Sequence, residues 1–153
     1  MTTPLQHPIL GIDHGEARFG IAITDAAGIL AHPLETITVQ ATDPVTRIVE
    51  IIAQRQVQNI VLGLPLRMDG SEGTAAEKIR AFAVELTEKI TIPLHFQDER
   101  LTTVSASAKL HQAGKNAKKQ KSMIDQAAAV EILNNWLSAQ SPMEFPEEFH
   151  PDF

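Results

Sequence analysis

The sequence predicts an α/β fold: a mixed five-stranded sheet, with three antiparallel strands followed by parallel βα units and helices on both faces. Two observations indicate this class. Residues 9–39 contain short apolar runs separated by turn residues, which is typical of an antiparallel meander. The chain after residue 43 alternates amphipathic helical patterns with short continuous apolar runs, which is typical of buried parallel strands joined by right-handed crossovers.

Size and composition favour one folded domain in the cytoplasm. The chain has 153 residues and no cysteine, which excludes a disulfide framework and a thiolate metal site. No apolar run approaches the roughly 20 residues that a membrane span needs. The N-terminus lacks the basic and apolar segments of a signal peptide. We expect residues 1–138 to form the domain and residues 139–153 to form an acidic, proline-containing tail without a core of its own.

The meander is predicted to begin with a hairpin. Residues 9–14 and 18–25 read as its two strands, and Gly15 supplies the turn between them. Residues 29–39 read as a third strand, and Pro33 places it at an edge because proline cannot donate to a neighbour. Gly20, inside the second strand, indicates either a bulge or a close approach of another backbone.

The rest of the chain is predicted to alternate helices and strands. Asp43 and Pro44 are typical of a helix start, and the pattern of Thr74 followed by Glu77 is that of a capping box. Gly114 is expected to end a shorter helix. The predicted elements are a helix over 43–56, a strand over 59–63, a helix from 74, a strand over 92–96, a helix from 102 or 103 to 113, a basic loop over 115–121 and a helix over 123–139.

Two acids are expected at the carboxyl ends of strands, where ligands bind in open α/β sheets. Asp13 ends the first strand, and Glu99 follows the last one. Strand alternation places Glu99 on the same side as His95 and opposite Asp98. Capping of a helix, or a salt bridge with a neighbouring arginine, would equally account for an acid at positions 98 and 99.

A third acid, Asp125, is predicted to face the core. At 100° per residue, Asp125 falls on one stripe of the last helix with Ala129, Ile132 and Trp136. The alternative, a first-turn acid stabilised by the helix dipole, requires no inward orientation. Three carboxylates that meet would repel each other unless a cation joins them. Oxygen ligands favour Mg²⁺ or Mn²⁺, and a pair of such ions supports phosphodiester hydrolysis.

Four motifs resemble, in order, those of the YqgF family: GIDHGEARFGIAITD, IVLGLPLRMDGSEG, DERLTT and IDQAAA. These proteins are described as Holliday-junction-resolvase-like and as nucleases that mature the 5′ end of pre-16S ribosomal RNA. The resemblance covers Ile9 to about Leu137 and implies a ribonuclease H-like fold. It also implies that Asp13, Glu99 and Asp125 form the catalytic and metal-binding set. These are the same three acids that their positions on the strands and the last helix indicate.

Several side chains are candidates for nucleic-acid contact. Arg18 is placed to reach a phosphate, or else to pair with Glu16 or another acid. Glycines around Arg67 and Ser71 precede a helix N-terminus that could hold a phosphate, or they belong to a simple connector. The basic segment lies just before Asp125 and could neutralise phosphates, or it is only a solvated loop; its members are Lys115, Lys118, Lys119 and Lys121. His14, where the family often has an aromatic residue, is expected to pack.

Three kinds of function remain open on the sequence alone. The first is a nuclease using Mg²⁺ or Mn²⁺, acting on precursor ribosomal RNA or, as a resolvase, on branched DNA. The second is a nucleic-acid-binding or ribosome-associated protein without turnover. The third is a nucleotide-hydrolysing relative of the actin and sugar-kinase group, which would need two such domains. We expect a nucleic-acid partner, the ribosome among the possible ones, no membrane, and a monomer or weak homodimer.

Overall fold

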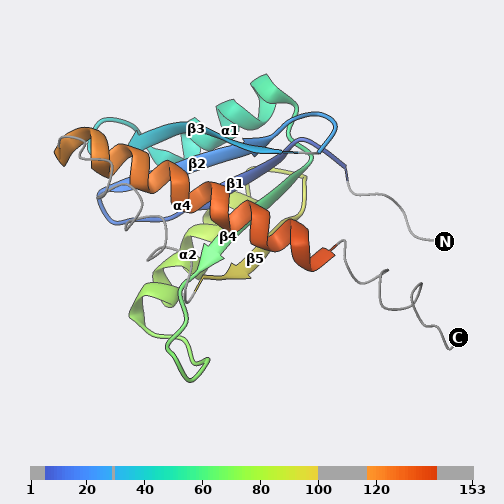
Figure 1. Cartoon of the computed structure of the whole chain (residues 1–153). Helices are drawn as coiled ribbons and strands as arrows, with labels where there is room; N and C mark the ends of the chain where they lie inside the picture. Colours follow the sequence, from blue (N-terminus) through green and yellow to red (C-terminus); the bar gives the residue numbers. More distant parts are fainter. Residues whose placement is uncertain (1–5, 29, 100–116, 141–153) are drawn as a thin grey trace, which may run out of the picture.

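A computed structural model describes residues 6–28, 30–99 and 117–140, the last helix with side chains from Met123. The described part contains five strands and three helices (Figure 1). None of its helices has the length and apolar character to cross a membrane. The elements, in chain order, are β1 (Ile9–Asp13), β2 (Arg18–Thr24), β3 (Ala31–Thr38), α1 (Pro44–Arg55), β4 (Asn59–Leu64), α2 (Thr74–Thr87), β5 (Leu94–Asp98) and α4 (Ala117–Gln140).

The strands form one mixed sheet in the order β3-β2-β1-β4-β5. The pairs β1–β2 and β2–β3 are antiparallel, whereas β1–β4 and β4–β5 are parallel. β3, which contains Pro33, lies at one edge, as predicted. β1 lies in the centre, so the carboxyl end of β1, with Asp13, is flanked by a strand on each side. The predicted fold class is therefore confirmed.

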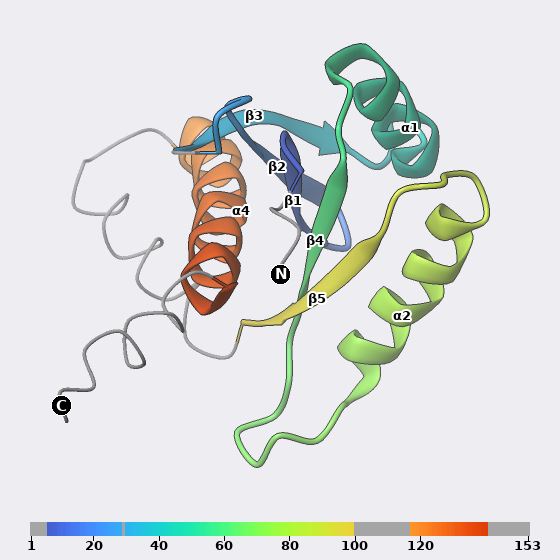
Figure 2. The same cartoon turned by 90° about the vertical axis from the view of Figure 1, so that its right-hand side faces the viewer.

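Helices cover both faces of the sheet. α4 lies against one face, and α1 and α2 lie against the other (Figure 2). Successive strand residues point to opposite faces of the sheet, and both sets are apolar because helices bury both faces. The core beneath α4 is the smaller one, and it consists of Ile9, Ala22, Val61, Ala129, Ile132, Leu133 and Trp136.

Three strand glycines allow α4 to approach the sheet closely. A β-carbon on Gly11 would lie 2.5 Å from Cγ of Leu133, and one on Gly20 would overlap the backbone carbonyl of Asp125. A β-carbon on Gly63 would lie 2.6 Å from Cδ1 of Ile132. The close backbone approach that the sequence suggested at Gly20 is thus made by α4. A register shift between Ile21 and Ala22 adds an irregularity to the same strand.

Several predicted boundaries differ from the observed ones. β5 begins at Leu94 rather than residue 92, and α4 begins at Ala117 rather than residue 123. The predicted loop over 115–121 is therefore helical from 117, because alanine, lysine and glutamine favour helices and no breaker interrupts them. The capping-box prediction is also wrong, because the N-cap of α2 is Gly73 and makes no side-chain bond. The predicted helix over 102–113 lies outside the described residues. Of the tail predicted over 139–153, residues 139 and 140 are the last residues of α4, and the remainder also lies outside the described residues.

The predicted start of α1 is confirmed. The carboxylate of Asp43 accepts hydrogen bonds from the backbone N–H of Thr46 at 3.0 Å and from its hydroxyl at 2.8 Å. We expect Asp43→Ala to lower the free energy of unfolding by about 1 kcal/mol, since the first turn loses its side-chain acceptor. Urea unfolding followed by circular dichroism measures this, with Asp43→Asn as the control that retains capping. Equal stability of Asp43→Ala and wild type would contradict it.

Candidate active site

Asp13 lies at the carboxyl end of β1 on the face that α4 covers. It pairs with Gly20 of β2, whose missing side chain lets the α4 backbone at Asp125 lie against the sheet there. Burial, and secondarily the negative charge of Asp125, raise the pKa of the Asp13 carboxyl from 3.8 to about 6. A buried carboxylate beside a second carboxylate is costly without a cation, so this is a place where the chain would bind one.

Asp125 reaches Asp13 because α4 crosses β2 at Gly20. The backbone carbonyl of Asp125 lies over Gly20, and Gly20 is the residue of β2 that pairs with Asp13. The inward stripe predicted for the helix is confirmed, because Ala129, Ile132 and Trp136 are buried on it. Burial raises the pKa of the Asp125 carboxyl, and its hydrogen bond to an arginine acts in the opposite direction. The dipole alternative is therefore not needed to explain this acid.

The arginine is Arg18, the first residue of β2. Its Nε donates to Oδ2 of Asp125 at 2.8 Å. The Arg18 side chain is 32% exposed and that of Asp125 is 18% exposed, so the ion pair lies at the rim of the buried region. The sequence predicted that Arg18 reaches a phosphate or pairs with Glu16 or another acid, and in the structure its ion-pair partner is Asp125. Alternation along β2 carried a usable signal, because positions 18 and 20 share a face.

Glu99 lies on the same face, with its carboxylate over Gly63 of β4, the parallel neighbour of β1. Its backbone N–H donates to the carbonyl of Leu64 at 3.2 Å, which continues the β4–β5 pairing past β5. Its Oε1 is 2.6 Å from where a β-carbon on Gly63 would stand. The neighbouring residues fit the predicted alternation: the His95 ring packs on Trp136 of α4 at 4.8 Å, and Phe96 lies under the guanidinium of Arg80.

The structure thus brings Asp13 and Asp125 together and places Glu99 on the same face. Within the described residues, no three carboxylate or imidazole side chains are arranged to hold a metal ion. The donor chemistry nevertheless fits a hard cation, because all three candidates are carboxylates. Two of them are adjacent, and a divalent ion would offset both the burial and the neighbouring charge that raise the pKa of Asp13. Binding by all three would require side-chain rearrangement.

The connection from β4 to α2 is an ordered turn that extends beyond the sheet (Figure 1). Leu66 bridges to Glu72, and the backbone N–H of Arg67 donates to the carbonyl of Ser71 at 2.8 Å. The backbone N–H and hydroxyl of Ser71 both donate to Asp69. The predicted phosphate contact by Ser71 would therefore have to replace these bonds, whereas the Arg67 guanidinium lies against Gly73 near the start of α2.

The lysines of the basic segment are only partly located. The backbone of Lys118, Lys119 and Lys121 lies in the first turns of α4, upstream of Asp125 on the same helix. Their side chains, and the whole of Lys115, lie outside the described residues. Their predicted contact with phosphate stays a prediction.

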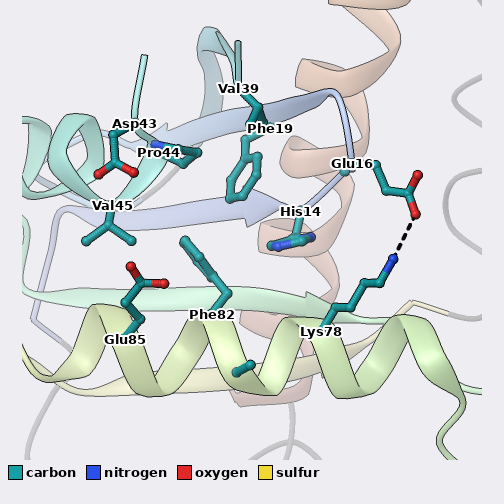
Figure 3. A pocket seen from close by; sticks show the side chains of 12 residues that line it. His14, Glu16, Phe19, Val39, Asp43, Pro44, Val45, Lys78, Phe82 and Glu85 are labelled. Atoms are coloured by element: carbon teal, nitrogen blue, oxygen red, sulfur yellow. Dashed lines mark hydrogen bonds and ion pairs between the residues drawn. The ribbon is translucent and has the colours of Figure 1, made fainter. Parts of the chain in front are cut away.

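A hollow of about 600 Å³ lies on the face of the sheet opposite Asp13 (Figure 3). His14 follows Asp13 in sequence and therefore points the other way, where its ring contacts Phe19 at 4.4 Å and Phe82 at 5.2 Å. Burial lowers the pKa of His14, which keeps the ring neutral at pH 7. The prediction that His14 packs fits these contacts. Acids outnumber lysines in this lining, which makes it a poor surface for phosphates.

Comparisons with known proteins identify the family of the chain. A family model described as RuvX, Holliday junction resolvase, matches residues 7–139. A protein of Cutibacterium acnes is 46% identical over 129 residues, which is 84% of this chain and 80% of that protein. One of Nocardioides sp. is 41% identical, over 91% of this chain and 96% of that protein. Both carry the name "Putative pre-16S rRNA nuclease".

The fold has a solved counterpart. The structure described as T. thermophilus RuvC in complex with Holliday junction substrate aligns with a TM-score of 0.53 at 13% identity. The alignment covers 88% of this chain and 97% of that one. At this identity the likeness concerns the fold alone, and it confirms the ribonuclease H-like arrangement of the sheet.

Proposed function

The chain belongs to the RuvX family, and we propose on that basis that it is a metal-dependent nuclease that hydrolyses phosphodiester bonds in structured nucleic acid. The observation that carries the proposal is the juxtaposition of Asp13 and Asp125 at the carboxyl end of the central strand. Two carboxylates in partly buried surroundings repel each other, and burial, with the charge of Asp125 second, raises the pKa of Asp13. A structural role alone would be served better by a neutral residue.

The proposed roles follow from position. Asp13, on the central strand, is the shared ligand, and Asp125 and Glu99 complete the site from the helix and from the end of β5. When bound, Mg²⁺ or Mn²⁺, which we propose to be a pair of ions, would activate water and stabilise the leaving oxygen. Arg18 and the α4 lysines would bind phosphates on this face, and Arg67 would bind them from the projecting turn.

We propose precursor 16S ribosomal RNA, at its 5′ end, as the substrate. The support is the name shared by relatives more than 40% identical to the chain. The aromatic residues support a structured substrate: the chain has no tyrosine, and its single tryptophan is buried on the side of α4 that faces the sheet. Single-strand recognition by base stacking is therefore disfavoured, and recognition of shape and backbone fits better. The ribosome is the corresponding partner.

A Holliday junction is the alternative substrate, and the description of the family model favours it. Resolution of a junction requires two symmetric cuts, which would call for a homodimer with both sites facing the same junction. The two substrates therefore differ in the oligomeric state that they require. A monomer that cleaves RNA supports the first, and a dimer that cleaves junctions supports the second.

One cleavage assay tests the function. Purified protein is incubated with a pre-16S leader RNA or a four-way DNA junction, with Mg²⁺ or Mn²⁺ and with a chelator. We expect metal-dependent cleavage of the RNA by wild type and a loss of at least about 1,000-fold in Asp13→Asn, Glu99→Gln and Asp125→Asn, by analogy with removal of other essential catalytic groups. Cleavage by Asp13→Asn at the wild-type rate would contradict the proposal.

The same assay separates a binding protein from an enzyme. If the chain only binds nucleic acid, wild type retains the RNA in a filter-binding measurement but never cleaves it with either metal. Combined replacement of Lys118, Lys119 and Lys121 by glutamine would then abolish retention, which shows that the basic turns of α4 are the binding surface. For a nuclease, the same triple variant cleaves with a raised KM.

A further inference from the structure

Arg18 is hydrogen-bonded to the carboxylate of Asp125, which the proposed function assigns to a metal ion as a ligand. Its Nε donates to Oδ2 of Asp125 at 2.8 Å, while Asp125 lies beside Asp13. The guanidinium is thus the cation that offsets the negative charge of the pair in this structure. A carboxylate oxygen that accepts from arginine at this distance is not free to ligate a metal in the same direction.

We propose that Arg18 is an exchangeable counter-cation: it holds Asp125 while the site lacks metal, is displaced when a divalent cation binds, and then binds a phosphate of the substrate. The inference rests on the proposed function and adds to it an order and a coupling. Metal binding releases the guanidinium, and the released guanidinium is the group that recognises the phosphodiester backbone.

The position of Arg18 suits such an exchange. Its side chain is 32% exposed, and it begins β2 beside the turn from β1, so it reaches the pair from the solvent side. Asp125 is less exposed, at 18%, and is fixed because the α4 backbone rests on Gly20. Of the two partners, the arginine is therefore the one that can move. Its long side chain keeps its charge throughout, so the exchange requires no proton transfer.

Arg47 provides the contrast within the same chain. It also pairs with a partly exposed acid, Glu35, but through two bonds, from Nε at 2.9 Å and Nη2 at 2.8 Å. It further donates to Glu50 at 3.1 Å. This pair joins β3 to α1, on the face opposite Asp13, and stabilises that packing. The Arg47 side chain is 28% exposed, which is similar to the 32% of Arg18, and Arg47 therefore makes a matched control.

The exchange predicts that the metal and the nucleic acid assist each other. The metal binds Asp125 and the nucleic acid binds Arg18, so each of them must break the pair of Arg18 and Asp125. When both bind, this free-energy cost arises only once. By thermodynamic linkage, metal then increases the affinity for nucleic acid, and nucleic acid increases the affinity for metal by the same factor. Removal of Arg18 should therefore strengthen metal binding and weaken the coupling.

The first experiment measures Mn²⁺ binding to the full chain without nucleic acid, by isothermal titration calorimetry. We expect Arg18→Gln to bind Mn²⁺ about tenfold more tightly than wild type, which is the effect of removing one charge-assisted hydrogen bond that competes. Arg47→Gln should bind it as wild type does. Unchanged or weaker Mn²⁺ binding by Arg18→Gln would overturn the inference, provided that circular dichroism shows a folded variant.

The second experiment measures binding of the leader RNA with Ca²⁺, which supports binding without cleavage in many metal nucleases, and without divalent ions. We expect Ca²⁺ to raise the RNA affinity of wild type and Arg47→Gln about tenfold more than that of Arg18→Gln. Without divalent ions, wild type and Arg18→Gln should bind RNA equally, because Arg18 is then held by Asp125. A loss in Arg18→Gln that is the same in both conditions would show an ordinary phosphate contact and overturn the exchange.

Failure of this inference is distinguishable from failure of the proposed function. Mn²⁺ binding that Asp125→Asn abolishes and Arg18→Gln leaves unchanged refutes the exchange and retains the metal-dependent nuclease. Absence of Mn²⁺ binding in wild type, Arg18→Gln and Arg47→Gln alike refutes both. Restoration of wild-type Mn²⁺ affinity in Arg18→Lys would support competition by a cation at this position rather than a role of the arginine shape.

Discussion

Replacing Asp13 with asparagine is expected to stabilise the metal-free protein while it abolishes cleavage. At pH 7 the Asp13 carboxyl is mostly ionised, in a place where burial and Asp125 raise its pKa to about 6. The rise of the Asp13 pKa from 3.8 to about 6 corresponds to about 3 kcal/mol of unfavourable interaction of the ionised carboxylate. Because asparagine carries no charge, we expect Asp13→Asn to unfold with a free energy about 2 kcal/mol higher than wild type at pH 7.

The sign of the pH dependence follows from the raised pKa. Between pH 3.8 and about 6 the folded state binds more protons at Asp13 than the unfolded state does. Stability therefore falls as the pH rises through this window, and the loss is complete above the folded-state pKa. The stability difference between Asp13→Asn and wild type should be small below pH 4 and reach its full size above pH 6.

Urea unfolding monitored by the fluorescence of Trp136, the only tryptophan, measures both effects. Glu85→Gln is the control, because Glu85 is exposed on α2 and its replacement should change stability by less than about 0.5 kcal/mol. Mg²⁺ or Mn²⁺ should stabilise wild type and not Asp13→Asn. A less stable Asp13→Asn at pH 7 would show that the carboxylate is satisfied in the fold and would remove the main support for a metal site.

A methyl group at Gly20 is expected to separate α4 from the sheet. The β-carbon of Gly20→Ala would overlap the backbone carbonyl of Asp125, and a helix backbone cannot rotate aside as a side chain does. We expect the free energy of unfolding to fall by about 3 kcal/mol, the upper part of the range for overpacked positions. The shift would also move Asp125 away from Asp13 and Arg18, so cleavage should fall more than stability alone explains.

Gly63→Ala is the matched control for this effect. Its β-carbon would meet Oε1 of Glu99 and Cδ1 of Ile132, each at 2.6 Å, and both are ends of side chains that can turn away. We expect this variant to lose about 1 kcal/mol and to retain the packing of Trp136, as its emission maximum reports. Similar losses in Gly20→Ala and Gly63→Ala would contradict the special role assigned to the crossing at Gly20.

Local patterns in the sequence account for most of the fold. The period of two along residues 94–99 predicted which side chains face α4, and His95 and Phe96 confirm it from opposite faces. The stripe on the last helix predicted that Asp125 faces inward. Asp43 predicted the start of α1, and Pro33 predicted an edge strand. Each of these features depends on residues within a turn or a strand, so the periodicity of the chain is enough to determine it.

Predictions failed where a local signal had a competitor. Thr74 and Glu77 match a capping box, but Gly73 is the N-cap, because the turn over 66–72 sets where α2 can begin. The lysines before Asp125 were assigned to a loop on account of their charge, although their intrinsic preference is helical. The neighbouring turn decided the first boundary, and the helical preference of the residues themselves decided the second.

By itself the sequence determined that Asp13 ends the central strand, that Glu99 follows the last one, and that Asp125 lies on an apolar helix stripe. Only the tertiary structure decided that Asp125 lies beside Asp13 and pairs with Arg18, and that the Glu99 carboxylate lies over Gly63. The reason is that the pair of Arg18 and Asp125 joins residues 107 positions apart. Such a contact depends on where α4 crosses the sheet, and that crossing is set by the space above Gly20 and by the packing of the whole helix.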